Sequence, residues 1–123
     1  MEMLKLGFSS IMFDGSALPV EGKCGCHRGS GQGVRSFGVP LEAEIGELCR
    51  LDDRGNKIGA SNIADPDVVR QYLKLCHPDS LAIGIGNAHG FYNGPVDIRV
   101  EVLEECRKFT DITLCSSRLY GYG

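Results

Sequence analysis

The sequence predicts an α/β fold built from parallel strands, and two observations support this prediction. Four apolar, strand-like runs occur at residues 7–14, 39–46, 80–86 and 111–115, and three of them are nearly continuous rather than alternating. Continuous apolar runs are typical of parallel strands that are covered by helices. Amphipathic helical segments precede the last two runs. The resulting order of strand, helix, strand, helix, strand indicates right-handed βαβ units.

The first part of the chain departs from this regular order. Residues 1–6 have the pattern of a final helical turn that stops at Gly7, where the first strand begins. A helix should then precede the strand at 39–46, because parallel neighbours need a crossover connection. Residues 22–38 instead contain six glycines, and glycine is a poor helix former. We therefore predict a helix that is disrupted at about residues 22–35.

The two later helices have clear sequence signals. In "ADPDVVRQYLKL", Asp65 is placed as the N-cap and Pro66 as the first helical residue. Four apolar residues then share one helical face: Val68, Val69, Tyr72 and Leu73. In "DIRVEVLEECRKF", three residues are expected on the buried face: Val100, Leu103 and Cys106.

The composition indicates one globular domain and excludes two classes of partner. The chain has 123 residues, of which 24% are charged and 42% hydrophobic, and its net charge is −3. This charge gives no reason to expect binding to nucleic acid or to an anionic membrane. No apolar run approaches the roughly 20 residues that span a bilayer, and the first residues lack the pattern of a signal peptide. We therefore expect a cytoplasmic protein whose six cysteines stay reduced.

Polar side chains lie at or near the ends of three predicted strands. Asp14 ends the first strand, Glu42 and Glu44 lie in and at the end of the second, and His89 follows the third. Because the carboxyl ends of parallel strands meet at one edge, a histidine and two carboxylates there would suit a divalent metal. Alternatively, Asp14 and Glu44 are solvated and His89 is hydrogen-bonded within its loop. The spacing alone favours this simpler interpretation.

The glycines of "GIGNAHG" also have two interpretations. They could let backbone N–H groups approach a phosphate, or they could only allow a tight turn after a buried strand. Farther upstream, Cys24, Cys26 and His27 have the spacing of a metal knuckle. Such a knuckle needs at least one more ligand, and no nearby residue in the sequence offers one.

Three segments together resemble the class II ketose-bisphosphate aldolases. They are "GFSSIMFDGSALPVE", "VPLEAEIGEL" and "LAIGIGNAHGFYNGPVDIRVEVLEECRKFTDI", in the family's order and spacing, and they cover most of residues 3–114. The resemblance implies a zinc-dependent (β/α)₈ TIM barrel, of which residues 1–123 would form a part with about four of the eight strands. It also implies reversible cleavage of fructose or tagatose 1,6-bisphosphate to dihydroxyacetone phosphate and glyceraldehyde 3-phosphate, as in glycolysis. The intact enzymes are usually homo-oligomers.

The resemblance assigns roles to four residues of this sequence. His89 would bind the catalytic zinc, and Gly90 would contact dihydroxyacetone phosphate. Asp14 and Glu44 would lie near a second, divalent or monovalent cation. The zinc would act as a Lewis acid on the substrate carbonyl and would stabilise the enediolate that forms when the carbon–carbon bond breaks.

Parts of the family's active site have no counterpart in this sequence. The first zinc histidine and the proton-transferring aspartate belong to an H-x-D-H stretch before the "GFSS" segment. The third zinc histidine belongs to an "LHGxSG" segment after the last strand. The usual Gly-Gly pair after "EIGEL" is replaced by Cys49 and Arg50. Because a catalytic zinc normally has three protein ligands, we expect the chain alone to be inactive.

Two stretches of the sequence suggest changes of reading frame. Codons can be chosen for residues 115–121 that, read one base later, encode "VLHGSTG", which resembles the missing zinc-histidine segment. Codons for residues 22–34 can likewise encode "ENVAATGEVVRAF", which has the spacing of an amphipathic helix. We therefore hypothesise that residues 22–34 and 115–123 are frame-shifted parts of a truncated aldolase. Cys24, Cys26 and Cys115 would then have no role in the family's chemistry.

Two further functions stay open. The chain could be a non-catalytic remnant that binds metal weakly or pairs with other chains through its strand edges. It could instead be a small α/β module whose Cys24, Cys26 and His27 hold a structural metal.

Overall fold

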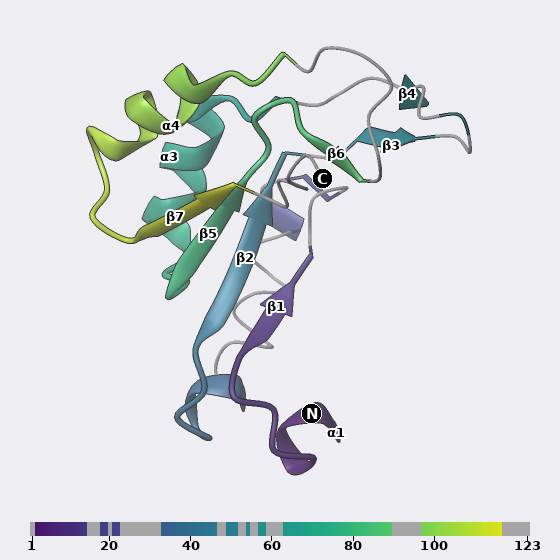
Figure 1. Ribbon diagram of the computed structural model, residues 1–123. Helices are drawn as coiled ribbons and strands as arrows, with labels where there is room; N and C mark the ends of the chain where they lie inside the picture. Colours follow the sequence, from purple (N-terminus) through teal and green to yellow (C-terminus); the bar gives the residue numbers. More distant parts are fainter. Residues whose placement is uncertain are drawn as a thin grey trace.

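The computed structural model describes residues 2–14, 18–19, 21–22, 33–46, 49–51, 54, 57–58, 63–89 and 97–116. At residues 49–51, 57–58 and 88–89 it places the strand backbone. Figure 1 shows one parallel sheet with two helices on the same side of it and a second, smaller sheet near the ends of its strands. No helix within the described ranges is long and apolar enough to cross a membrane.

The main sheet consists of the four predicted strands in their order along the chain. The strands are β1 (Ile11–Phe13), β2 (Leu41–Ile45), β5 (Ser80–Ile83) and β7 (Thr113–Ser116), and every neighbouring pair is parallel. Each new strand is therefore added on the same side of the previous one. A singly wound arc of this kind is what a section of a (β/α)₈ barrel requires, whereas doubly wound sheets reverse their strand order. The α/β prediction with parallel strands is confirmed.

The helix α3 (Pro66–Leu75) begins and ends as the sequence predicts. The Asp65 carboxylate accepts a hydrogen bond from the Asp67 amide at 2.8 Å and so caps the first turn, and Pro66 occupies the start of the helix. Val69 and Tyr72 are buried against the sheet. The helix ends at Cys76, whose backbone is extended, two residues before Pro78.

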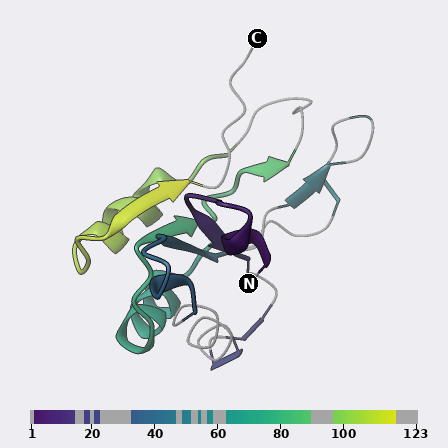
Figure 2. The ribbon, with the colours of Figure 1, turned by 90° about the horizontal axis from the view of Figure 1, so that it is seen from below.

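The helix α4 (Val100–Arg107) confirms one part of its prediction and corrects another. Cys106 is fully buried and Leu103 packs partly against the core, as expected. The expected burial of Val100 is wrong, because this side chain is 51% exposed. α4 packs against α3, and both helices lie on the left side of the view in Figure 2. Val100 is the first residue of α4, and the end of a helix is covered by fewer neighbours than its middle.

The main core lies between the sheet and these two helices. Alternate residues of the strands face the helices, since successive side chains in a strand point to opposite faces. Ala43 and Ile45 from β2, together with Leu81 and Ile83 from β5, belong to one buried cluster with residues of α3 and α4. Glu42, Glu44, Ser80 and Ala82 consequently lie on the opposite face of the sheet.

A smaller core lies at the beginning of the chain. The helix α1 (Glu2–Lys5) ends before Gly7, which has a φ of 82°, as the sequence predicts. Leu4 packs with Val34 and Leu41. The disrupted helix predicted at about residues 22–35 lies mostly outside the described residues. At its two ends, residues 21–22 and 33–35 are helical.

The second sheet was not predicted from the sequence. It contains β3 (Cys49–Leu51), β4 (Lys57–Ile58) and β6 (Ala88–His89), in the order β4-β3-β6. β3 pairs antiparallel with β4 and parallel with β6. Since β3 follows the end of β2 and β6 follows the end of β5, this sheet lies beyond the carboxyl ends of the main strands (Figure 1).

Candidate functional site

The predicted site residues lie at the carboxyl edge of the main sheet, to the extent that the structure describes them. Asp14 directly follows β1 and is exposed. Glu44 lies near the end of β2. The backbone of His89 lies in β6, where it pairs with Arg50 of β3. Gly90 and the side chain of His89 are outside the described residues, and so are Cys24, Cys26 and His27.

The turn between β5 and β6 holds the backbone that leads to His89. The Gly84 amide donates to the Ile45 carbonyl and the Gly84 carbonyl accepts from the Ala64 amide, both at 2.8 Å. The Arg99 amide donates to the Ile85 carbonyl at 2.8 Å. These bonds tie the turn to the end of β2 and to the starts of α3 and α4. The position of the chain at His89 is therefore set by three neighbouring segments.

Gly86 is required by the geometry of this turn. Its φ is 99°, and a Cβ atom at this position would lie 2.5 Å from the Asp97 carbonyl oxygen. The Gly84 amide is already used by Ile45. Gly84 therefore offers no free N–H group, and the positive φ of Gly86 allows a tight turn after the buried strand, which agrees with the second interpretation of "GIGNAHG".

Asn87 completes the turn and was missed by the sequence analysis. Its side chain is only 1% exposed, and its Oδ1 atom accepts a hydrogen bond from the Ile85 amide at 3.3 Å. A buried amide that bonds its own turn fixes the turn geometry, because an unpaired buried amide would be costly. The signal in the sequence is the asparagine itself after a buried strand, because asparagine is common in turns.

Glu44 is a buried carboxylate on the face of the sheet away from the helices. Only 6% of its surface is exposed, so the simpler interpretation of this residue as a solvated group is wrong. Through the strand register, Glu44 is level with Ala82 of β5, which in turn is level with Cys115 of β7. The Glu44 charge contributes to a raised pKa at the Cys115 thiol, which places the two side chains in the same electrostatic environment.

Glu42 is a second polar residue on the same face of the sheet, two residues before Glu44 in β2. Its Oε2 atom accepts a hydrogen bond from the Ser80 hydroxyl at 3.0 Å and another from the Cys115 thiol at 3.4 Å. Burial, followed by the Glu42 charge, raises the pKa of Cys115 to about 11. The thiol therefore stays protonated at neutral pH and acts as a hydrogen-bond donor rather than a nucleophile.

These polar groups do not form a metal site by themselves. Among the described residues, no three His, Cys, Asp or Glu side chains are arranged to hold a metal ion. Asp14 and Glu44 are both described and supply at most part of such a set. A zinc ion bound at this edge of the sheet would therefore need further ligands from outside the described part of the chain.

Comparison with known proteins identifies what this arrangement resembles. The family model "Fructose-bisphosphate aldolase class-II" matches residues 1–119. A fructose-bisphosphate aldolase of Mycoplasma pneumoniae is 34% identical over 112 residues, which is 90% of this chain and 38% of that protein. A 6-phospho-5-dehydro-2-deoxy-D-gluconate aldolase of Bacillus subtilis is 29% identical over 92% of this chain, again covering 38% of that protein.

Solved structures agree with this similarity. The YdjI aldolase of Escherichia coli K12 matches 93% of this chain with a TM-score of 0.70 and 25% identity. A fructose-bisphosphate aldolase of Campylobacter jejuni matches 88% of it with a TM-score of 0.56 and 28% identity. The chain spans 38% and 33% of these two structures. This coverage fits the four-stranded arc as part of a barrel.

Proposed function

Because the chain belongs to the class II fructose-bisphosphate aldolase family, we propose that it is part of the catalytic barrel of an aldolase that reversibly cleaves a ketose 1,6-bisphosphate. The products would be dihydroxyacetone phosphate and glyceraldehyde 3-phosphate. The observation that carries this proposal is the family match over residues 1–119. Within this range, the buried Glu44 and the turn before His89 both lie at the edge of the sheet where the strands end.

The residue roles follow the family resemblance. His89 would be a ligand of the catalytic zinc, and Gly90 would contact the dihydroxyacetone phosphate part of the substrate. Glu44 and Asp14 would lie near a second cation. The burial of Glu44 supports a role in the site rather than at the solvated surface. Asp14 is exposed, so its surroundings give less support to a role in the site.

The chain alone should not turn over substrate. The described residues contain no complete metal-binding group, and the chain spans 38% of its curated relatives. A coupled assay of the purified chain with fructose 1,6-bisphosphate and added zinc tests this directly. We expect no turnover above a control that contains zinc but no protein, and turnover above that control would refute the expectation.

A hybrid enzyme tests the residue roles. Residues 35–114 of this chain would replace the matching segment of the Mycoplasma pneumoniae aldolase, whose own sequence then supplies the two segments that we hypothesise to be frame-shifted here. We expect the folded hybrid to show zinc-dependent cleavage that is lost in His89→Ala and kept in His77→Ala. If a folded hybrid is inactive, or if His89→Ala leaves its activity intact, the aldolase role of these residues is wrong. Zinc binding by the 123-residue chain that is lost in His27→Ala but kept in His89→Ala would instead favour the small metal-binding module.

The same hybrid distinguishes two substrate classes. Relatives of similar identity are named for fructose bisphosphate and for 6-phospho-5-dehydro-2-deoxy-D-gluconate. A ketose 1,6-bisphosphate should give the higher kcat/KM if the proposed substrate class is correct. A clear preference for the phosphorylated deoxygluconate would keep the aldolase proposal and reject this substrate.

The reading-frame hypothesis remains part of the proposal for residues 22–34 and 115–123. It is supported by the segments "ENVAATGEVVRAF" and "VLHGSTG", which suitably chosen codons for these residues would encode one base later and which resemble the family at the matching positions. Sequencing of the coding DNA decides the matter. If the actual codons, read one base later, do not give these segments, the hypothesis fails.

We further propose that the intact protein is cytoplasmic and homo-oligomeric.

A further inference from the structure

A cavity of about 370 Å³ lies between α3 and the segment that joins α4 to β7. Pro78 and Ile112 line it; Pro78 lies two residues before β5, and Ile112 directly precedes β7. The cavity is thus at the amino ends of the strands, whereas His89 follows their carboxyl ends. It takes no part in the proposed aldolase site.

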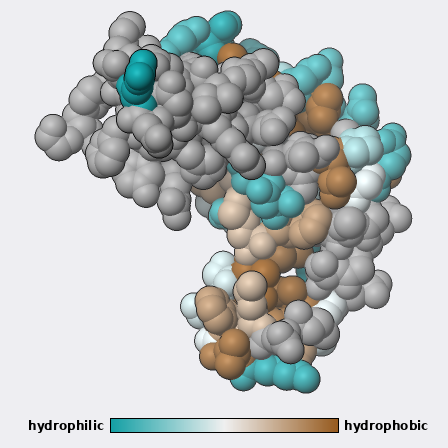
Figure 3. Space-filling view, turned by 90° about the vertical axis from the view of Figure 1, so that its right-hand side faces the viewer, coloured by the Kyte–Doolittle hydropathy of each residue, from teal (hydrophilic) through white to brown (hydrophobic). Residues whose placement is uncertain are grey.

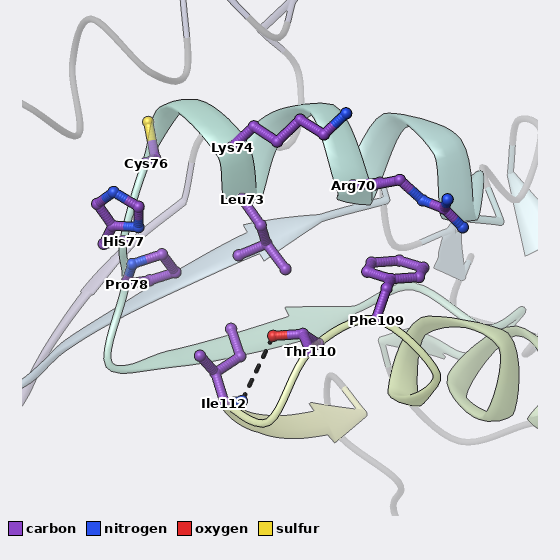
Figure 4. Close-up of a pocket in the computed structure, with 9 residues that line it drawn as sticks. All are labelled: Arg70, Leu73, Lys74, Cys76, His77, Pro78, Phe109, Thr110 and Ile112. Atoms are coloured by element: carbon purple, nitrogen blue, oxygen red, sulfur yellow. Dashed lines mark hydrogen bonds between the residues drawn. The ribbon is translucent and has the colours of Figure 1, made fainter.

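The inner part of the cavity is apolar. Leu73, Phe109 and Ile112 line it, and each is partly buried against the main core. Figure 4 shows Leu73 extending from α3 into the space above Thr110 and Ile112. A volume of this size falls within the range of about 300–1,000 Å³ that is usual for small-molecule sites, which combine apolar walls with a few polar groups.

Three hydrogen bonds, two of them between a side chain and the backbone, hold the wall opposite α3. The Arg107 guanidinium donates from Nη1 to the Ile112 carbonyl at 3.0 Å, and the Phe109 amide donates to the Cys106 carbonyl at 3.2 Å. The Ile112 amide donates to the Thr110 hydroxyl oxygen at 3.4 Å, the bond drawn in Figure 4. The cavity is therefore formed before any ligand binds, which reduces the ordering cost of binding.

Basic side chains lie around this apolar space, and none of its lining residues is acidic. Arg70 and Lys74 are exposed and one helical turn apart on α3. The ion pairs of the described residues join Arg99 to Glu101 and Lys108 to Glu105, and neither involves Arg70 or Lys74. Two cations that have no carboxylate partner among the described residues are notable in a chain whose net charge is −3.

Among the described residues, an aromatic ring rather than an ion pair orients Arg70. Its Cζ atom lies 4.5 Å from the centre of the Phe109 ring, and Figure 4 shows the guanidinium over that ring at one end of the cavity. Stacking uses the face of the guanidinium and leaves the N–H groups in its plane available. These N–H groups match the geometry of a carboxylate or phosphate.

We propose that this cavity binds a small amphipathic anion. Its apolar ring or short chain would lie against Leu73, Phe109 and Ile112, and its carboxylate or phosphate group would bind Arg70 and Lys74. This site is independent of the proposed aldolase function, because the two lie at opposite ends of the same strands.

Titration of the isotope-labelled 123-residue chain with phenyl phosphate, followed by NMR, tests the site. We expect saturable shifts of the amides at residues 70–77 and 108–112. Phenyl phosphate should bind more tightly than phenol or inorganic phosphate, because only phenyl phosphate supplies both the ring and the charge. A parallel titration with benzoate shows whether a carboxylate or a phosphate is preferred, and saturable binding of either supports the site.

Two variants and one control assign the binding to the named residues. Arg70→Gln should weaken phenyl phosphate binding about tenfold, which corresponds to about 1.4 kcal/mol. Leu73→Trp should abolish it by filling the cavity while leaving both cations in place. Arg99→Gln removes the same charge from an exposed arginine elsewhere and should change nothing. The proposal is overturned if no shifts saturate, if phenol or inorganic phosphate binds equally well, or if Arg70→Gln behaves like Arg99→Gln.

Discussion

Substitution of Gly86 by alanine should destabilise the protein strongly, for two separable reasons. The first is the backbone conformation: a φ of 99° is one that residues with a Cβ rarely adopt, at a cost of about 1–2 kcal/mol. The second is steric. The added Cβ would lie 2.5 Å from the Asp97 carbonyl oxygen, well inside normal contact distance.

The steric part is not easily relieved. The contacting atom belongs to the backbone rather than to a flexible side chain. The segment that carries it is held two residues later, where the Arg99 amide donates to the Ile85 carbonyl at 2.8 Å. Overpacking of this kind typically costs about 1–3 kcal/mol. The two contributions together predict a loss of about 2–5 kcal/mol, a large part of the about 5–15 kcal/mol that stabilises a typical domain.

Gly38 provides a matched control for this experiment. Its φ is 68°, but a Cβ added there would meet nothing within 4 Å. Gly38→Ala should therefore cost only the conformational part, about 1–2 kcal/mol. Urea unfolding of both variants, monitored by circular dichroism, gives the two free energies of unfolding. If Gly86→Ala is no more destabilising than Gly38→Ala, the close approach of Asp97 does not constrain this turn and our explanation of Gly86 is wrong.

Three other substitutions test the cap, the core and the polar face of the sheet. Asp65→Ala removes the cap of α3 and should lower the free energy of unfolding by about 1 kcal/mol in urea denaturation; an unchanged value would contradict the capping role. Leu81→Ala, at a fully buried position, should lower the free energy of unfolding by about 2–5 kcal/mol. Leu6→Ala, at a position that is 76% exposed, should lower it by less than about 0.5 kcal/mol. Equal losses in the two variants would refute the assigned core. Glu42→Gln removes a negative charge that disfavours the Cys115 thiolate, so the pH midpoint of Cys115 alkylation should fall from about 11. Peptide mass spectrometry measures this midpoint, and an unchanged or higher value would show that Glu42 does not act on the thiol.

The strands and the later helices could be predicted because their signals are local. The run containing Leu81 and Ile83 is apolar whichever face is considered, as a strand in the middle of a covered sheet requires. Asp65 and Pro66 mark the start of α3 by chemistry that acts within one turn. These signals can be found in the sequence because they depend on residues that are close together along the chain.

The polar face of the sheet could not be predicted, because it depends on register between distant strands. Glu42 meets Ser80 and Cys115, which are 38 and 73 residues away. No local pattern shows that these side chains share one face. The sequence assigns Cys115 no role in the family's chemistry and gives no sign of the hydrogen bond that its thiol donates to Glu42 in the structure. The small strands β3, β4 and β6 were missed for a related reason, since two or three residues are too short to show a period.

The two cores of the molecule are unequal, and this bears on which part of it carries function. Among the residues that the structure describes, the cluster between the sheet and α3 and α4 contains ten buried residues, whereas the cluster beside α1 contains three. Near α1 and β1, large apolar side chains remain about half exposed or more: Met3, Leu6, Phe8 and Met12. Figure 3 shows apolar surface at the lower end of the molecule, where Figure 1 places α1 and β1.

Both proposed sites draw mainly on the larger core. The turn before His89 is bonded to the end of β2 and to the starts of α3 and α4, and the anion cavity is enclosed by α3 and the segment after α4. Burial of apolar surface contributes about 25 cal/mol per Å², so the well-packed part of the chain is the part that can hold side chains in fixed positions. Asp14 follows β1 and is supported by the smaller core. This difference in packing is a physical reason to assign the fixed part of the site to the His89 turn and Glu44, and a lesser part to Asp14.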